Sequence, residues 1–189
     1  MRLILASASP RRAELLTSAG FHFEVVPADV DETPKPSESP KAYALRVARD
    51  KAVAVSARRQ EPGSVVLAAD TVVVADGEIL GKPRDSVDAA RMLRRLANAV
   101  HDVLTAVVIR APAGERAEVV TTRVSFLPLD ETEIAWYVAS GEPDGKAGAY
   151  GIQGRAARFI ERIDGSWSNV VGLPLATVYR LLKEVSVVD

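Results

Sequence analysis

Apolar and polar positions along the chain form two kinds of pattern, one typical of buried strands and one typical of amphipathic helices. Apolar runs predict strands at residues 3–5, 21–27, 65–69, 72–75, 78–80, 101–110, 116–126 and 159–163. Helical patterns begin at residues 10, 40, 86, 130 and 174, and the longest is expected to end near residue 59. We therefore predict an α/β fold with a mixed, partly antiparallel sheet flanked by helices.

Short polar motifs indicate where several of these elements begin or turn. Ser9, Ser39 and Ser86 are expected N-caps, and the first two precede a proline suited to the first helical position. Asp130-x-x-Glu133 has the spacing of a capping box. Asp76-Gly77 predicts a tight turn between two antiparallel strands.

The helix predicted from residue 40 has a regular apolar face. Its members are Ala44, Val47, Ala48, Ala52 and Val55. Lys51 lies near the middle of this helix, and its position alone predicts a solvated side chain.

The first helix has two arginines at its positively polarised end. Arg11 and Arg12 fall in its first turn, where the helix dipole disfavours cations. A bound phosphate would account for them, because the hydroxyls of Ser7 and Ser9, backbone N–H groups and both guanidinium groups would converge on it. The alternative is a capped surface helix with two solvated arginines. The dipole argument also predicts that Arg12→Ala leaves the stability of the ligand-free protein unchanged or slightly higher.

Asp70 directly follows five apolar residues of a predicted strand. A carboxylate is expensive to bury there without a partner, so it either pairs with a structural group such as an arginine or faces a cleft. In a cleft it could bind a metal or polarise a water molecule.

Other polar residues allow both functional and structural interpretations. Lys82 lies in a rigid Gly-Lys-Pro turn and is either a phosphate ligand or an exposed turn residue. Glu32 lies in a polar loop, where a solvated acid is the simpler interpretation and a metal-side carboxylate the other. Gln153 stands between two glycines and could read a base edge through its donor and acceptor. For His101 we expect a structural role.

Composition narrows the class of protein. The chain has 189 residues, 48% of them hydrophobic and 26% charged, which favours one soluble domain over residues 1–189 with two lobes. Its formal net charge of −1 gives no indication of nucleic-acid or membrane binding. The absence of cysteine excludes thiol catalysis and cysteine-based metal sites. We expect a cytoplasmic location, because no signal peptide or membrane-spanning apolar run is visible.

Taken together, the motifs resemble the Maf family of nucleoside triphosphate pyrophosphatases, also called septum formation inhibitors. The blocks that carry the resemblance are SASPRRAELL (7–16), VDET (30–33), RVARDKA (46–52), AADTVVVADGEILGKP (68–83), HDVLTAV (101–107), GEPDGKAGAYGIQG (141–154) and NVVGLPL (169–175). The resemblance implies two lobes around a nucleotide cleft, and hydrolysis of a nucleoside triphosphate to a monophosphate and pyrophosphate. It also implies a divalent cation, Mg²⁺ or Mn²⁺, and a homodimer.

The resemblance assigns roles to individual residues. Asp70 matches the proton acceptor, and Glu32 and Asp70 are the candidate metal-side carboxylates. The positions that the family uses for phosphate, metal or catalysis are matched by Ser7, Arg12, Glu32, Lys51 and Lys82. Those of the branch that prefers dTTP and UTP are matched by Arg11, Thr71 and Gln153.

Two other functions remain as alternatives at this point. One is a nucleotide-binding regulator of septum formation with incidental hydrolysis, and the other is a pyrophosphatase that prefers 7-methyl-GTP. The chain also departs from the family pattern at Ala68, Asn98 and Asp144-Gly145, and the last departure leaves the role of Asp144 open.

Overall fold

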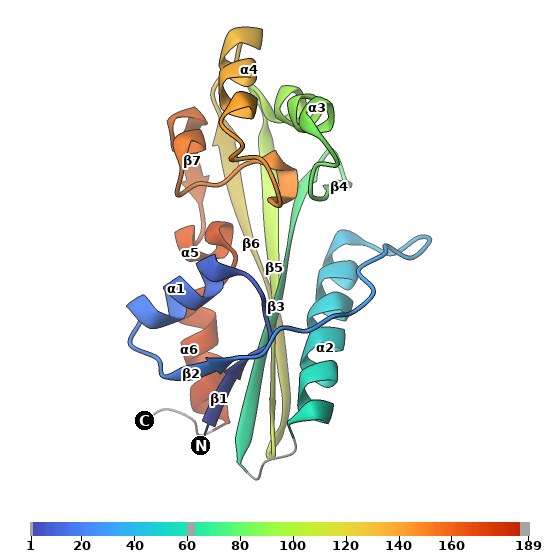
Figure 1. Cartoon of the computed structure of the whole chain (residues 1–189), viewed down its shortest axis with the longest axis vertical. Helices are drawn as coiled ribbons and strands as arrows, with labels where there is room; N and C mark the ends of the chain where they lie inside the picture. The colour runs from blue at the N-terminus through green and yellow to red at the C-terminus, as the bar shows by residue number, and fades with distance from the viewer. Residues whose placement is uncertain (1, 60–62, 186–189) are drawn as a thin grey trace. The chain divides into compact units, whose positions relative to one another are not determined.

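The computed structural model describes residues 2–59 and 63–185 (Figure 1). In chain order the elements are β1 (Arg2–Leu5), α1 (Pro10–Ser18), β2 (Phe23–Val25), α2 (Pro40–Arg58), β3 (Ser64–Ala75), β4 (Glu78–Leu80), α3 (Ser86–Leu96), β5 (Val100–Ala111), β6 (Gly114–Phe126), α4 (Glu131–Ala139), η1 (Ala147–Ala149), η2 (Arg155–Phe159), β7 (Ile160–Asp164), α5 (Trp167–Val171) and α6 (Leu175–Glu184). In these described residues, no helix is both long enough and apolar enough to cross a membrane.

The strands form one mixed sheet. Its order is β2-β1-β3-β5-β6-β7, and β4 pairs with β3 outside this path. Strand β1 runs parallel to both β2 and β3, with Leu5 opposite Val25 and Leu67. The β3–β4 and β6–β7 pairs are antiparallel. The predicted mixed, partly antiparallel sheet is therefore confirmed.

The chain folds into two compact units, each assembled from separate segments. Unit 1 comprises residues 1–70, 105–120 and 172–189, and unit 2 comprises residues 71–104 and 121–171. Strands β3, β5 and β6 contribute residues to both units. The nucleotide cleft expected around two lobes, and the single domain over residues 1–189, stay predictions.

Unit 1 contains β1, β2, α1, α2 and α6. The predicted apolar face of α2 is confirmed, since all five of its members are fully buried. Val65 to Ala69 of β3 are also buried, as a strand covered on both faces requires. Unit 1 therefore places Asp70 directly after a fully buried stretch of strand.

Unit 2 has its own core, built from α3, α4 and the inner faces of the strands. The predicted turn before β4 is confirmed, because Asp76 and Gly77 both have positive φ, at 51° and 79°. The capping box of α4 is also confirmed, with Asp130 accepting from the backbone of Glu133 and the Glu133 side chain accepting from the backbone of Asp130.

Three predicted helix ends differ in detail. The N-cap of α3 is Asp85, whose carboxylate accepts from the backbone of Asp88, and not Ser86. Ser9 stands at the N-cap of α1, but its side chain makes no capping hydrogen bond. The α3 helix also ends at Leu96, because Asn98 has a φ of 52° and turns the chain. Asparagine tolerates this left-handed conformation, so Asn98 can occupy the turn without a glycine.

Candidate active site

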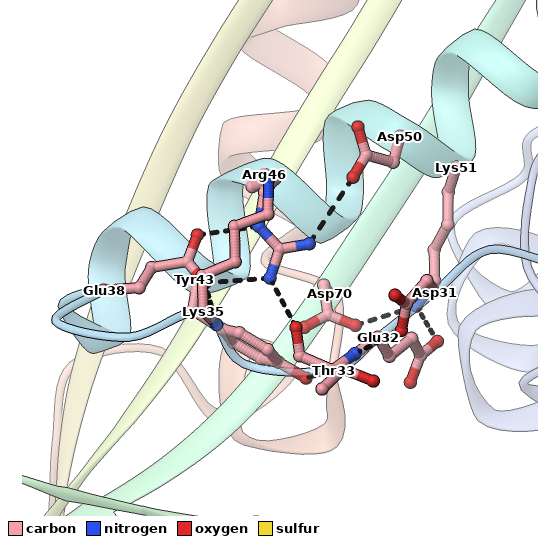
Figure 2. A network of polar contacts seen from close by, with 10 residues as sticks. All are labelled: Asp31, Glu32, Thr33, Lys35, Glu38, Tyr43, Arg46, Asp50, Lys51 and Asp70. Atoms are coloured by element: carbon pink, nitrogen blue, oxygen red, sulfur yellow. Dashed lines mark hydrogen bonds and ion pairs between the residues drawn. The ribbon is translucent and has the colours of Figure 1, made fainter.

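Asp70, Lys51 and Glu32 form a charged cluster in unit 1 (Figure 2). The ammonium of Lys51 lies 2.8 Å from Oδ1 of Asp70 and 2.7 Å from Oε1 of Glu32. The side chains of Lys51 and Asp70 are each only 10% exposed, while that of Glu32 is 40% exposed. The solvated lysine that position alone favoured is therefore wrong, whereas Glu32 is partly exposed to solvent and also pairs with the buried Lys51.

Burial governs the protonation chemistry of this cluster. It raises the pKa of the Asp70 carboxyl, while the neighbouring Lys51 ammonium and Arg12 guanidinium act in the opposite direction. The negative charge of Glu32 adds to the upward shift of this pKa. Asp70 thus combines a buried carboxyl, a hydrogen-bonded cation and a nearby second acid, an arrangement suited to holding or moving a proton.

Arg12 is a buried residue of unit 1 and not a solvated one. Its Nε donates to the carbonyl of Gly172 at 2.8 Å, and its Nη1 donates to Oγ of Ser7 at 3.1 Å. Burial lowers the pKa of Arg12, and the carboxylates of Asp70 and Glu32 oppose this shift. The alternative of a solvated Arg12 is therefore wrong, and the expected neutral or stabilising effect of Arg12→Ala stays a prediction.

The start of α1 thus brings together part of the predicted phosphate site. Ser7 is buried, accepts from Arg12 and also accepts from the backbone N–H of Ser9 at 3.2 Å. Arg11, the residue directly before Arg12, is half-buried. Ser7, Arg12, Lys51, Glu32 and Asp70 all belong to unit 1, which holds most of the predicted machinery.

Thr71, Lys82 and Gln153 belong to unit 2. Thr71 follows Asp70 along β3, and successive strand residues point to opposite faces of a sheet. Lys82 is exposed on a turn whose preceding residue, Gly81, accepts from the backbone N–H of Gly148 at 3.0 Å. This bond joins the Lys82 turn to the glycine-rich segment 141–154.

Two glycines in that segment lie close to the side chains of other residues. A Cβ on Gly148 would lie 2.9 Å from Val73, and φ at this glycine is 68°. A Cβ on Gly154 would lie 2.1 Å from a carboxylate oxygen of Glu142. That carboxylate accepts from the backbone N–H of Arg155 at 2.8 Å. Glu142 therefore holds the end of the exposed turn that contains Gln153.

His101 has the structural environment that its position suggested. It is buried in unit 2, where its Nε2 lies 2.8 Å from the hydroxyl of Tyr150. Its ring also packs edge-on against Tyr150 and Phe126. Asp144, in contrast, lies exposed in a turn, and the following Gly145 supplies the positive φ of 68°.

The carboxylates of Glu32 and Asp70 offer the oxygen ligands that Mg²⁺ and Mn²⁺ prefer. Lys51 contacts one oxygen of each carboxylate. Within residues 2–59 and 63–185, no group of three or more acidic, histidine or cysteine side chains could hold a metal ion. Two carboxylates fit a cation that draws its remaining ligands from phosphate and water, as Mg²⁺ commonly does.

Tyr43 and Arg46 contact the loop of Glu32 but were absent from the predicted site residues. A signal for Lys51 was available, because it shares a helix face with the buried Val47 and Val55. A lysine on an otherwise apolar helix face must reach a partner, and the same face continues back to Tyr43.

The fold and this cluster define an α/β protein with a buried, charged centre of the kind found in enzymes. A model of the Maf family, described as Maf-like protein, matches residues 2–185. The "dTTP/UTP pyrophosphatase" of Anaeromyxobacter dehalogenans (strain 2CP-1 / ATCC BAA-258) is 55% identical over 186 residues, covering 96% of this chain and 93% of that protein. That of Geobacter metallireducens (strain ATCC 53774 / DSM 7210 / GS-15) is 52% identical over 184 residues, covering 96% and 95%.

The chain therefore belongs to the Maf family, and the resemblance drawn from its motifs is confirmed. A solved structure of a "Nucleoside-triphosphatase / dITP/XTP pyrophosphatase" from Mycobacterium abscessus is also similar, at 18% identity and a TM-score of 0.40. It covers 68% of this chain and 76% of that one.

Proposed function

We propose that this chain is a nucleoside triphosphate pyrophosphatase that hydrolyses dTTP and UTP to the monophosphate and pyrophosphate. The observation that carries the proposal is the buried Asp70 carboxylate, hydrogen-bonded to Lys51 at the end of the unit 1 part of β3. Family membership and relatives above 50% identity that are named dTTP/UTP pyrophosphatase support this substrate class.

Asp70 would supply the general base. Hydrolysis of the α–β phosphoanhydride needs a water molecule oriented and deprotonated next to the α-phosphorus. Because burial raises the pKa of Asp70, its carboxylate is a stronger base than a solvated aspartate. Lys51 keeps the carboxylate oriented through its 2.8 Å contact.

Positive groups in the same unit would stabilise the phosphate oxygens. Arg12 and Lys51 carry the charge, and the Ser7 hydroxyl lies beside Arg12. Such groups stabilise the charge that develops on the departing pyrophosphate, because they are already in place before the reaction. Lys82 stays a predicted phosphate ligand, and Arg11, Thr71 and Gln153 stay predicted determinants of base choice.

A divalent cation is part of the proposal. Mg²⁺ or Mn²⁺ held by Glu32 and Asp70 would neutralise phosphate charge as a Lewis acid. The homodimer and the cytoplasmic location stay predictions.

A substrate panel tests the proposed function directly. Pyrophosphate release is measured with dTTP, UTP, 5-methyl-UTP, 7-methyl-GTP and the common purine triphosphates, each with Mg²⁺, Mn²⁺ or a chelator. We expect the highest kcat/KM for dTTP and UTP, and loss of turnover with the chelator. Absence of turnover with every triphosphate would refute the enzyme and favour the regulatory alternative, while a preference for 7-methyl-GTP would favour the other branch.

A further inference from the structure

The loop that carries Glu32 has no helix or strand of its own. It spans residues 26–39, between the end of β2 and the start of α2, and most of its residues are exposed. Glu32 nevertheless reaches the ammonium of Lys51 at 2.7 Å. A loop without contacts would populate many backbone conformations, and ordering it in one of them costs conformational entropy. Contacts with other residues must therefore fix the loop in the conformation that brings Glu32 to Lys51.

Tyr43 of α2 holds Glu32 by its main chain. The phenol hydroxyl donates to the carbonyl oxygen of Glu32 at 2.7 Å, and the Tyr43 side chain is buried. Tyr43 and Lys51 are eight residues apart, so they lie on the same face of α2, two turns from each other. The helix therefore contacts Glu32 twice, through the backbone carbonyl and through the carboxylate.

The environment of Tyr43 keeps its hydroxyl a donor. Burial, together with the negative charges of Asp70 and Glu32, raises the pKa of Tyr43 to about 12.

Arg46 holds the residues that follow Glu32. Its guanidinium makes a two-pronged contact with the Glu38 carboxylate, Nε to Oε1 at 2.7 Å and Nη2 to Oε2 at 2.8 Å. Nη2 also donates to the carbonyl of Thr33 at 3.0 Å. The guanidinium carbon of Arg46 lies 5.4 Å from the centre of the Tyr43 ring, so the two residues that hold the loop also contact each other (Figure 2).

We propose that Tyr43 is a positioning residue for the reaction, holding the Glu32 carboxylate beside Lys51 and Asp70, and that Arg46 supports it by fixing the rest of the loop. The inference rests on the proposed function for its kinetic part. Neither residue touches the proposed reacting groups, so both act through Glu32.

Two conservative variants and two matched controls test this. Tyr43→Phe removes only the hydroxyl, and Arg46→Lys keeps the charge but loses the fork that grips Glu38. Tyr179→Phe is the tyrosine control, on the exposed surface of α6. Arg49→Lys is the arginine control, because Arg49 also lies on α2 and pairs with an acid, Glu115, outside the loop.

Steady-state kinetics are measured for each single variant, and Tyr43→Phe is also combined with Glu32→Gln in a double-mutant cycle. We expect kcat/KM for UTP to fall roughly 2- to 10-fold in Tyr43→Phe and about 10-fold or more in Arg46→Lys, with both controls unchanged. In the Glu32→Gln background, Tyr43→Phe should have almost no further effect, because the group that it positions is gone. Equal effects of Tyr43→Phe in both backgrounds would overturn the proposal.

Hydrogen exchange of peptides from residues 26–39 gives a readout that is independent of turnover. We expect faster exchange in Tyr43→Phe and Arg46→Lys, with unchanged exchange in α6. Unchanged exchange in the loop would overturn the inference whatever the kinetics. If the wild type hydrolyses no triphosphate, the proposed function fails, and faster loop exchange in the variants would still support the positioning of Glu32.

Discussion

Each of the two units buries a polar cluster, and the two clusters differ in charge. In unit 1, Asp70 and Lys51 form an ion pair whose side chains are each 10% exposed. In unit 2, His101 and Tyr150 share one hydrogen bond and pack edge-on with Phe126. Burial raises the pKa of Asp70 against the opposing effect of the Lys51 and Arg12 cations, whereas in the second cluster it favours the neutral forms of both groups.

This difference separates a functional cluster from a structural one. Burying charges carries a large desolvation cost, so a buried ion pair is a poor way to gain stability. A neutral histidine bonded to a tyrosine carries a lower desolvation cost, because neither group is charged. Burial lowers the pKa of His101 to about 4 and raises that of Tyr150, so neither group is charged near neutral pH. We therefore assign chemistry to the charged cluster and packing to the neutral one.

The largest expected effect concerns the charged cluster. Asp70→Asn is nearly isosteric and removes the charge and the basicity, so kcat should fall about 10²- to 10⁴-fold. Melting temperature is measured alongside kcat for UTP, and we expect a folded variant. Asp164→Asn, at the exposed end of β7, is the control and should retain activity. A near-wild-type kcat in Asp70→Asn would mean that the charged cluster, like the neutral one, has only a structural role.

Removing the cation of the charged cluster should affect stability as well. Lys51→Met leaves Asp70 and Glu32 without their shared ammonium, and loss of one partner from a buried pair costs about 3 kcal/mol. Urea unfolding measures this loss. The double variant Lys51→Met with Asp70→Asn should recover part of it, because the buried carboxylate is then absent. No recovery would mean that Lys51 contributes by packing and not by charge.

The neutral cluster should make the free energy of unfolding depend on pH. His101 is neutral in the folded protein down to a pKa of about 4, against an ordinary value of 6.5. Between these values the unfolded chain binds the extra proton, so the stability due to neutral His101 is complete above pH 6.5 and is lost as pH falls toward 4. Acidification from pH 7.5 to 4.5 should therefore cost the wild type roughly 2 to 3 kcal/mol more than His101→Gln.

Urea unfolding at both pH values makes this measurement, with His22→Gln as the exposed control. The His22 variant should follow the wild type. If His101→Gln loses as much stability on acidification as the wild type, then His101 is not buried in its neutral form. Turnover by His101→Gln at pH 7.5 should stay near wild type, as expected for a structural residue.

The last comparison concerns base choice by a residue of unit 2. Gln153 can pair its amide with O4 and N3–H of uracil or thymine. In Gln153→Glu an acceptor would face O4, so kcat/KM for UTP should fall about 5- to 150-fold. A cationic 7-methylguanine should lose less, and the ratio of kcat/KM for UTP to that for 7-methyl-GTP is therefore measured. An unchanged ratio would mean that Gln153 does not read the base, and specificity would then have to be sought elsewhere.

Local patterns predicted the secondary structure well because they depend on nearby residues. The Asp76-Gly77 turn and the Asp130–Glu133 capping box are complete within four residues of chain, and both are present. Ser86 was mistaken for the N-cap of α3 because Asp85, one residue earlier, is an equally good acceptor. The short elements α5, η1 and η2 were missed, since segments of three to five residues have too few positions to show a period.

The sequence by itself determined the family, the order of the elements and the residue types needed for chemistry, because these features depend on motifs of consecutive or nearby residues. Only the tertiary structure decided which of them meet. Asp70 pairs with Lys51 from α2, and Arg12 donates to the carbonyl of Gly172, 160 residues away. The physical reason is that burial, and with it protonation and pairing, depends on segments that approach only when the chain has folded.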